Sequence, residues 1–226
     1  IAFKEVGSSL NRKVEQVTEV SSSSCQNVAE PAVDPVHLVS AGIAIVAATY
    51  GIARYAYGLF LPQIRTDLGL STDVMGLIAG GSYAGYLVAT LIGSSISAVT
   101  GPRLPVVIGG GCAALGMALI GLSDSAWALA LGVFLAGTSP GFAYPPLSDA
   151  VVRLVVQGNR NRAYAWINSG TSFGVILAGP VALWAGGDWR LAWMLFAGLA
   201  FAATVWNYAL MPTGRYGGEA HQLPSL

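Results

Sequence analysis

The stretch "YGIARYAYGLFLP", residues 50–62, places an arginine inside a run of residues that is otherwise apolar. The run extends from Leu38 to Leu61, and a helix needs about 20 apolar residues to cross a bilayer. A charged side chain at the centre of such a helix costs about 3 kcal/mol on insertion scales. Arg54 is therefore expected to have a function or a partner that offsets this cost.

The composition is typical of an integral membrane protein. Hydrophobic residues make up 54% of the 226 residues and charged residues only 10%, whereas about 25% of an ordinary soluble domain is charged. The net charge is zero, so nothing in the composition indicates a nucleic-acid partner. Cys25 and Cys112 provide neither a disulfide framework nor metal-ligand spacing. We expect no metal site and no cofactor. The expected partner of most of the surface is the lipid bilayer.

Apolar runs separated by short polar breaks predict six transmembrane helices, so the predicted fold class is an all-α integral membrane protein. The predicted spans are Leu38–Leu61, Val74–Ala98, Leu104–Leu122, Ala126–Val156, Ala163–Trp184 and Leu191–Met211. The chain then divides into a serine-rich tail that we expect to be disordered, residues 1–35, a six-helix bundle, residues 36–212, and a short tail or start of a linker, residues 213–226.

Small residues four positions apart occur in three of the spans and predict close packing of helix backbones. The pairs are Gly76 with Gly80, Gly81 with Gly85, Gly137 with Gly141, and Gly170 with Gly174. Prolines at 145–146 and after Gly179 predict kinks in the fourth and fifth spans.

Basic residues predict the orientation of the chain, because cytoplasmic loops carry an excess of lysine and arginine. Eight lie on one side of the predicted spans and two on the other. The eight are Lys4, Arg12, Lys13, Arg103, Arg153, Arg160, Arg162 and Arg215, and the two are Arg65 and Arg190. Both termini are therefore expected to be cytoplasmic, in a multi-pass protein of the cytoplasmic (inner) membrane.

Two stretches are similar to a known family. "NRNRAYAWINSGTSFGVILAGPVALWAGGDWRLAW", residues 159–193, has a basic loop, a glycine-rich helix and Asp188-Trp189-Arg190 at the start of the next helix. Together with "GIARYAYGLFLPQIRTDLGLS", residues 51–71, it resembles the major facilitator superfamily, and specifically a bacterial branch with a Gly-x-x-Arg-aromatic-Ala-Tyr first helix. The resemblance implies a secondary transporter made of two six-helix halves, of which this chain corresponds to the N-terminal half, a 3+3 inverted repeat.

The loop between the second and third spans departs from that family. It reads "SSISAVTGPRLP", residues 94–105, and keeps only Gly101 and Arg103 of the usual motif. Ala98 and Val99 stand where an Asp-Arg pair is expected, and Val133 stands where the fourth helix usually has an arginine. The candidate residues for gating and conformational change are Gly101, Arg103, Asp149, Gly179 and Pro180.

Helical spacing suggests what surrounds Arg54. Positions i, i+4 and i+7 share a helix face, so Tyr50, Arg54 and Tyr57 are expected to project together. The family resemblance implies a central cavity lined by the first, second, fourth and fifth helices, where Tyr144 and Asn168 are further candidates. Tyr83, Tyr86 and Thr171 are weaker candidates for the same cavity, and for all five of these residues the alternative is a hydrogen bond between helices. The alternative is a structural ion pair between Arg54 and Asp149.

The predicted function is secondary active transport of a small organic solute by alternating access, coupled to protons. An anionic solute is favoured in this prediction because Arg54 would bind a negative charge. The chain begins with Ile1 and holds six spans, so we expect a fragment or half that works with a second six-helix half. The alternative is a six-helix membrane subunit with a binding or regulatory role. An intramembrane serine protease is disfavoured, although Ser139 and Ser172 lie in Gly-x-Ser-x-Gly strings, because both strings lie in apolar helical runs and neither histidine, His37 nor His221, lies mid-membrane. We therefore do not expect an enzyme.

Overall fold

The computed structural model describes residues 35–185 and 187–211. Six segments in this part of the chain are helical, long enough and apolar enough to cross a membrane, which confirms the predicted all-α membrane fold. The first segment is built from α2 (Pro35–Val46), η1 (Ala47–Ile52) and α3 (Ala56–Leu68). The others are α4 (Thr72–Thr100), α5 (Arg103–Gly121), α6 (Ala126–Leu154), α7 (Arg160–Trp184) with the short turn η2 (Gln157–Asn159) before it, and α8 (Trp189–Leu210). The predicted tails, residues 1–35 and 213–226, lie outside the described residues except for Pro35.

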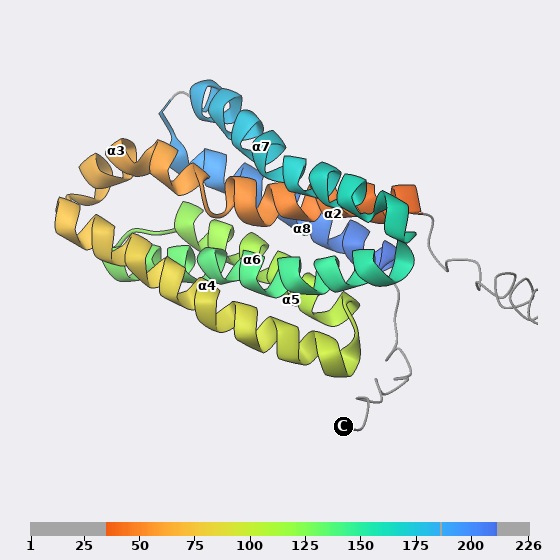
Figure 1. Cartoon of the computed structure of the whole chain (residues 1–226). Helices are drawn as coiled ribbons and strands as arrows, with labels where there is room; N and C mark the ends of the chain where they lie inside the picture. The colour runs from red at the N-terminus through yellow and green to blue at the C-terminus, as the bar shows by residue number, and fades with distance from the viewer. Residues whose placement is uncertain (1–34, 186, 212–226) are drawn as a thin grey trace, which may run out of the picture. The chain divides into compact units, whose positions relative to one another are not determined.

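The first span is broken near its middle, where the sequence predicted a continuous helix. Residues Ala47–Ile52 form a π-helical segment, in which the N–H of Ala53 donates to the carbonyl oxygen of Ala48, five residues earlier. A turn over residues 53–55 follows, and α3 begins at Ala56 (Figure 1). Single π-helical turns occur frequently at functional sites. Here the break places Arg54 in the turn rather than on a regular helix.

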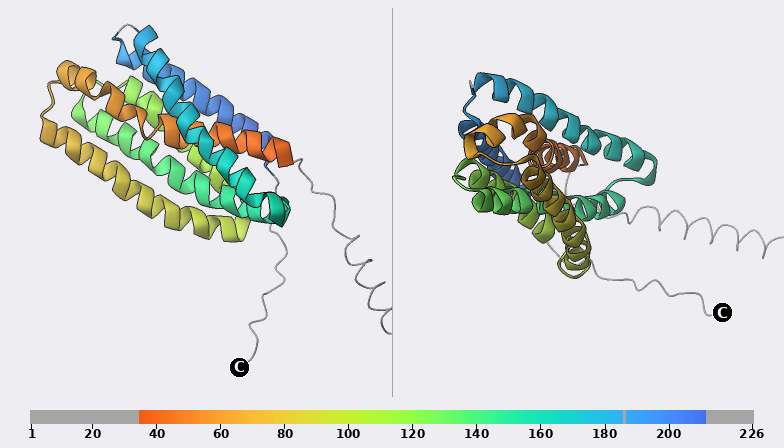
Figure 2. Two further views of the ribbon diagram at one scale, coloured as in Figure 1. Left: turned by 45° about the horizontal axis from the view of Figure 1, so that its top comes forward. Right: turned by 90° about the vertical axis from the view of Figure 1, so that its left-hand side faces the viewer.

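The six spans pack in a defined order of neighbours. Helix α6 packs against both α4 and α5, and α5 also packs against α8. The first span packs against α7 through η1 and α2, and against α8 through α2 (Figures 1 and 2). Across one face of the bundle the elements therefore follow the order α4, α6, first span, α7. Helices α4 and α7 lie at the two margins of this face.

Two apolar clusters hold the bundle together. In one, Phe60 of α3 packs against Trp193 and Phe196 of α8, with ring centroids 5.9 to 6.1 Å apart. In the other, Leu38 and Ile45 of α2 pack with buried residues of α6 and α7. Each aromatic pair of this geometry contributes about 0.5–1.5 kcal/mol beyond the burial of its surface. The clusters therefore fix both halves of the broken first span against the rest of the bundle.

Glycines permit the closest helix contacts, as the sequence predicted for the fourth and fifth spans. A Cβ atom added at Gly174 would clash with the carbonyl oxygen of Ala47 and lie 2.7 Å from the Cα of Gly51. Gly170 faces the backbone of Ile43, and Gly141 faces the backbone of α4, in the same way. In the second span, a Cβ atom added at Gly85 would clash with side chains of Phe134 and Thr138 on α6, whereas one added at position 76, 80 or 81 would meet nothing within 4 Å among the described residues. The spacing in the second span therefore marks a contact at Gly85 and none at the other three glycines of the pattern within the described bundle.

The helix α6 continues through Pro140, Pro145 and Pro146 without a break in its helical assignment, and α7 continues through Pro180. A proline removes one helical hydrogen bond, and in a membrane protein neighbouring groups can replace it. These prolines therefore do not divide their helices in the way that the π-helical segment divides the first span.

Charged residues connect three elements at the end of the bundle where α3 ends and α8 begins. Arg190 forms an ion pair with Asp67 of α3, and a second nitrogen of the same guanidinium lies 3.5 Å from a carboxylate oxygen of Asp124. It also donates to the carbonyl oxygen of Ser123 at 3.2 Å, while the indole N–H of Trp189 donates to Asp67 at 3.1 Å. Charge-assisted bonds of this kind are stronger than neutral ones. We call this group, with its five residues, the Arg190 clamp.

The clamp yields a prediction for stability. Arg190→Gln and Asp67→Asn should each lower the midpoint of thermal unfolding in detergent by a small amount, because the groups are partly solvated. The double variant should lose no more than the larger single loss, because the two residues act through one shared contact. Arg65→Gln changes an arginine on α3, the helix of Asp67, that lies outside the clamp, and should leave the midpoint unchanged. Additive losses in the double variant would show that the two residues act independently.

Candidate functional site

Four spans bring polar and aromatic side chains together around the break in the first span. Tyr50 comes from η1, Arg54 from the turn after it, and the others from α4, α6 and α7. We define the Arg54 cluster as Tyr50, Arg54, Tyr83, Tyr86, Tyr144 and Asn168. The helices concerned are the first, second, fourth and fifth spans, the same four that the family resemblance implied.

The guanidinium of Arg54 lies over tyrosine rings. Its central carbon is 4.3 Å from the ring centroid of Tyr86, 4.5 Å from that of Tyr83 and 5.8 Å from that of Tyr50. A cation within about 6 Å of an aromatic face is attracted by about 0.5–2 kcal/mol, more where water is excluded. Arg54 is half-buried and Tyr83 is exposed. The rings therefore offset part of the cost of the charge and leave the guanidinium accessible.

Hydrogen bonds and ring contacts extend the cluster across the face. The hydroxyl groups of Tyr50 and Tyr86 are 3.2 Å apart, and the rings of Tyr50 and Tyr144 meet edge to face at 5.7 Å. The hydroxyl of Tyr144 in turn donates to the side-chain oxygen of Asn168 at 3.0 Å. Interhelical hydrogen bonds of this type stabilise membrane bundles by about 1 kcal/mol. The tyrosines thus couple α4, α6 and α7 to the segment that carries Arg54.

Arg54 has no carboxylate partner within residues 35–185 and 187–211. The ion pairs found there belong to Arg190. Asp149, which the sequence offered as the alternative partner, instead accepts a hydrogen bond from Ser97 at 3.5 Å. A positive charge that lies over tyrosine rings, in a span of a membrane protein, is suited to contact an anion from outside this part of the chain.

Tyr57 does not lie with Arg54, although regular helical spacing placed both on one face. It is 5% exposed, and its hydroxyl donates to the sulfur of Met75 at 3.6 Å. The reason is the break: the π-helical segment and the turn change the angle between successive side chains, so positions 50, 54 and 57 no longer share a face. Tyr83 and Tyr86, the weaker candidates, occupy the place that Tyr57 was expected to fill.

Three of the five candidate gating residues lie at one end of the bundle. Gly101 ends α4 with a φ of 85°, a conformation that favours glycine. Arg103 begins α5, and its guanidinium lies 4.0 Å from the ring centroid of Tyr208 on α8. Asp149 on α6 meets Ser97 on α4. This end therefore connects the α4–α5 loop to α6 and α8 without the Asp-Arg pair that the family motif usually provides.

Gly179 and Pro180 lie near the other end of α7, away from those three residues. A Cβ atom at Gly179 would meet nothing within 4 Å among the described residues. The two sets of candidate gating residues thus belong to opposite ends of the bundle.

The serine strings lie within helices. Ser139 is buried in α6, and its hydroxyl donates to the carbonyl oxygen of Ala136 at 2.6 Å. Ser172 lies on α7. A nucleophilic serine needs a base within hydrogen-bond reach, and the hydroxyl of Ser139 is already bonded to its own helix. Among the described residues, no group of three or more His, Cys, Asp or Glu side chains is placed to hold a metal ion.

Comparison with known proteins identifies the family. The family model described as Major Facilitator Superfamily matches residues 43–222, most of the chain. The chain belongs to the major facilitator superfamily. It is therefore a multi-pass membrane protein, as its six apolar helices also indicate.

The chain is also similar to one curated protein and to one solved structure. It is 27% identical over 185 residues to "Transcription regulatory protein OpdE" of Pseudomonas aeruginosa, an alignment that covers 79% of this chain and 45% of that protein. The crystal structure of a POT family transporter in complex with 5-aminolevulinic acid matches with a TM-score of 0.64 and 17% identity, over 78% of this chain and 37% of that one. The second likeness supports the fold alone. The chain spans less than half the length of the curated relative that it matches.

Proposed function

We propose that this chain forms the N-terminal half of a secondary transporter in the cytoplasmic membrane, and that the Arg54 cluster contacts a small organic anion during transport. The observation that carries the proposal is Arg54 itself: a guanidinium in the first span that lies over three tyrosine rings and has no carboxylate partner in the described part of the chain. Membership of a transporter superfamily supports this function over an enzymatic one.

The position of the cluster supports the proposal. Transporters of several folds bind their substrates near the middle of the bilayer, at discontinuous helices and between internal repeats. Arg54 lies at the break in the first span, and the cluster draws on spans one and two of the first repeat and four and five of the second. The cluster face would meet a second six-helix half, and alternating access would move the two halves around the bound solute.

Arginine and tyrosine suit an anionic solute. The planar guanidinium binds a carboxylate through two parallel hydrogen bonds and stays charged at any accessible pH. The hydroxyls of Tyr50, Tyr86 and Tyr144 add donors and acceptors around it. Coupling to protons is part of the proposal, and Asp149 is the carboxylate of the described spans that we assign to it, because it lies in α6 against α4 at the end that carries the α4–α5 loop.

Uptake into proteoliposomes tests the proposed function. The full-length protein, including any segment that follows residue 226, is reconstituted with an acidic exterior and offered radiolabelled succinate and glutamate, with neutral glycerol and protein-free liposomes as controls. We expect accumulation of at least one carboxylate above the glycerol level, and loss of accumulation when a protonophore collapses the gradient. If carboxylates still accumulate without the gradient, proton coupling is contradicted, and the proposed transport of carboxylates is not.

A membrane subunit that regulates without transporting is the second candidate, favoured by the name of the Pseudomonas aeruginosa relative, a transcription regulatory protein. It predicts that the full-length protein moves none of these solutes in either direction. It also predicts that Arg54→Leu leaves the regulated response intact, because regulation of that kind does not need an anion-binding cluster.

A further inference from the structure

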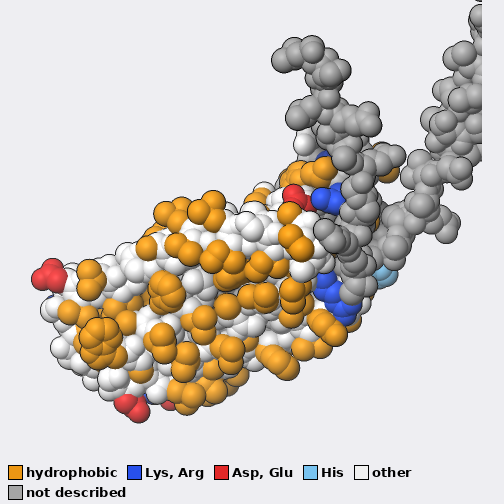
Figure 3. Space-filling view, turned by 90° about the horizontal axis from the view of Figure 1, so that it is seen from below, with side chains coloured by type: hydrophobic (Ala, Val, Ile, Leu, Met, Phe, Trp, Pro, Cys, Tyr) orange, Lys and Arg blue, Asp and Glu red, His pale blue; other side chains and the backbone are white. Residues whose placement is uncertain are grey.

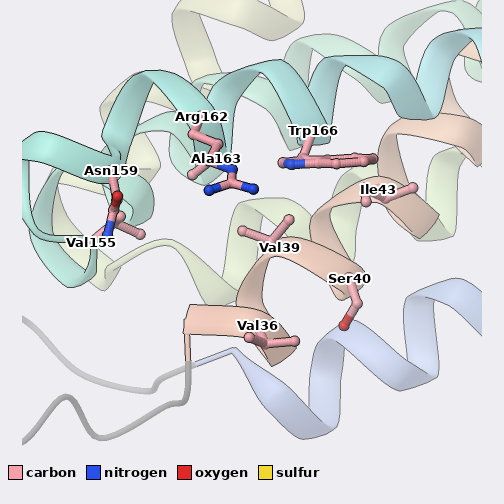
Figure 4. Close-up of a pocket in the computed structure, with 9 residues that line it drawn as sticks. All are labelled: Val36, Val39, Ser40, Ile43, Val155, Asn159, Arg162, Ala163 and Trp166. Atoms are coloured by element: carbon pink, nitrogen blue, oxygen red, sulfur yellow. The ribbon is translucent and has the colours of Figure 1, made fainter.

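A groove lies on the bundle away from the Arg54 cluster, between the start of α2 and the start of α7. It has a volume of about 370 Å³, and its walls are mostly apolar, with Val39 and Ile43 on α2 and Ala163 and Trp166 on α7 (Figure 4). Arg162 is the charged residue that lines it. The groove has no part in the function proposed above.

The groove opens on the flank of α7 opposite the cluster. Asn168 points toward Tyr144 of α6, as their hydrogen bond shows. Trp166 lies two positions earlier, which is about 200° around the helix. Its side chain is 52% exposed and lies beside Ile43 in the groove (Figure 4). The buried face between the two flanks, which includes Ile167 and Gly170, packs against the first span. Trp166 therefore faces the surroundings of the bundle on a side that the cluster does not use.

The charge in the groove is accessible. Figure 4 shows the guanidinium of Arg162 beside Ala163 and Trp166. Residues 35–185 and 187–211 offer it no ion pair, since the carboxylates that pair there contact Arg190. Arg160, two positions earlier, uses its Nε–H on the carbonyl oxygen of Val155 and adds a second positive charge nearby. Figure 3 shows basic side chains at one end of the visible face, with an acidic side chain beside them, and acidic side chains at the other end.

We propose that this groove binds an anionic phospholipid, with one acyl chain along its apolar wall and the phosphate at Arg162. Three features are complementary to such a lipid: an apolar channel for the chain, a guanidinium with no ion pair among the described residues for the phosphate, and an exposed tryptophan, a residue type that favours the membrane interface. The excess of basic residues at this end assigns it to the cytoplasmic leaflet, whose anionic lipids attract basic side chains. A phospholipid is the occupant because a free anion would leave the apolar wall unfilled.

Contact quenching of tryptophan tests the proposal. The full-length protein is placed in nanodiscs in which phosphatidylcholine is replaced stepwise by phosphatidylglycerol brominated on its acyl chains, or by brominated phosphatidylcholine at the same fractions. The contribution of Trp166 is the difference between the unmodified protein and Trp166→Phe. We expect half-maximal quenching of Trp166 at an about fivefold lower fraction of the brominated phosphatidylglycerol, since about 1 kcal/mol per basic side chain corresponds to that factor.

Variants separate the named charge from general attraction. Arg162→Gln should remove the fivefold preference, Arg162→Lys should keep most of it, and Arg65→Gln, an exposed arginine on α3, should not change it. Equal quenching by the two lipids in the unmodified protein would overturn the proposal, as would a preference that survives in Arg162→Gln. Loss of the preference in excess inorganic phosphate at constant ionic strength would overturn it in favour of a free anion. Quenching of Trp166 by neither lipid would assign the groove to an occupant other than lipid.

Discussion

Replacing Arg54 with leucine is expected to abolish carboxylate uptake by the reconstituted full-length protein. The change removes the one guanidinium of the cluster, and a hydrogen bond to a charged group contributes about 1.5–3 kcal/mol. Affinity should therefore fall by roughly one to two orders of magnitude, and the tyrosine hydroxyls that remain cannot supply the lost charge. Uptake rates at subsaturating solute, measured in proteoliposomes with equal protein content, give the result.

Three comparisons make this prediction specific. Membrane insertion should be unchanged, because leucine is more favourable than arginine in a span. Arg54→Lys should give an intermediate loss, since lysine keeps the charge and loses the planar fork. Arg65→Leu, which removes an arginine from α3 outside the cluster, should transport at the original rate. Undiminished uptake in Arg54→Leu would remove Arg54 from the transport pathway and return it to a structural role.

The number and positions of the spans could be predicted from the sequence, because they depend on the length and apolarity of whole segments. A single residue changes these two properties little. Six apolar runs gave six helices, and the glycine pairs of the fourth and fifth spans mark real contacts in α6 and α7. In the second span Gly85 marks a contact with α6, whereas a Cβ atom added at position 76, 80 or 81 would meet nothing within 4 Å among the described residues. A small residue permits close approach but does not specify a partner, so the pattern cannot distinguish a packed face from one that faces outward.

The sequence predicted that a polar site surrounds Arg54, but it predicted only some of the residues of that site. An arginine in an apolar span can be recognised from the sequence as a candidate functional residue, because placing its charge in a membrane costs free energy. Tyr57 was misplaced because 100° per residue holds only on an unbroken α-helix, and no residue between 47 and 52 is proline, the usual signal of a break. Gly51 and Gly174 bring η1 and α7 into backbone contact, and this contact between distant positions is visible only in the tertiary structure. The Arg190 clamp was missed for the same reason, since its carboxylates come from two other parts of the chain.

The contact between Gly51 and Gly174 carries the second large prediction. A Cβ atom at Gly51 would lie 2.6 Å from the Cα of Gly174 and 2.7 Å from the carbonyl oxygen of Thr171. The neighbours on both sides are backbone atoms, so a side-chain rotation cannot make room and the helices must separate. Overpacking of this kind typically costs 1–3 kcal/mol. Gly51→Ala and Gly174→Ala should each lower the free energy of unfolding by about 2 kcal/mol, measured by titration with a denaturing detergent.

A double variant and a control distinguish a shared contact from two separate ones. Once the first alanine has separated η1 from α7, the second meets a gap, so Gly51→Ala with Gly174→Ala should cost clearly less than the sum of the two. Gly198→Ala, in the middle of α8 where an added Cβ atom would meet no described residue within 4 Å, should cause no loss, since alanine is the better helix former. Fully additive losses would show that the two glycines do not act through one contact. Arg54 lies three residues after Gly51, so separation of these helices should also displace the guanidinium from the tyrosine rings and weaken anion uptake. The same close contact would then hold the fold together and keep Arg54 in place.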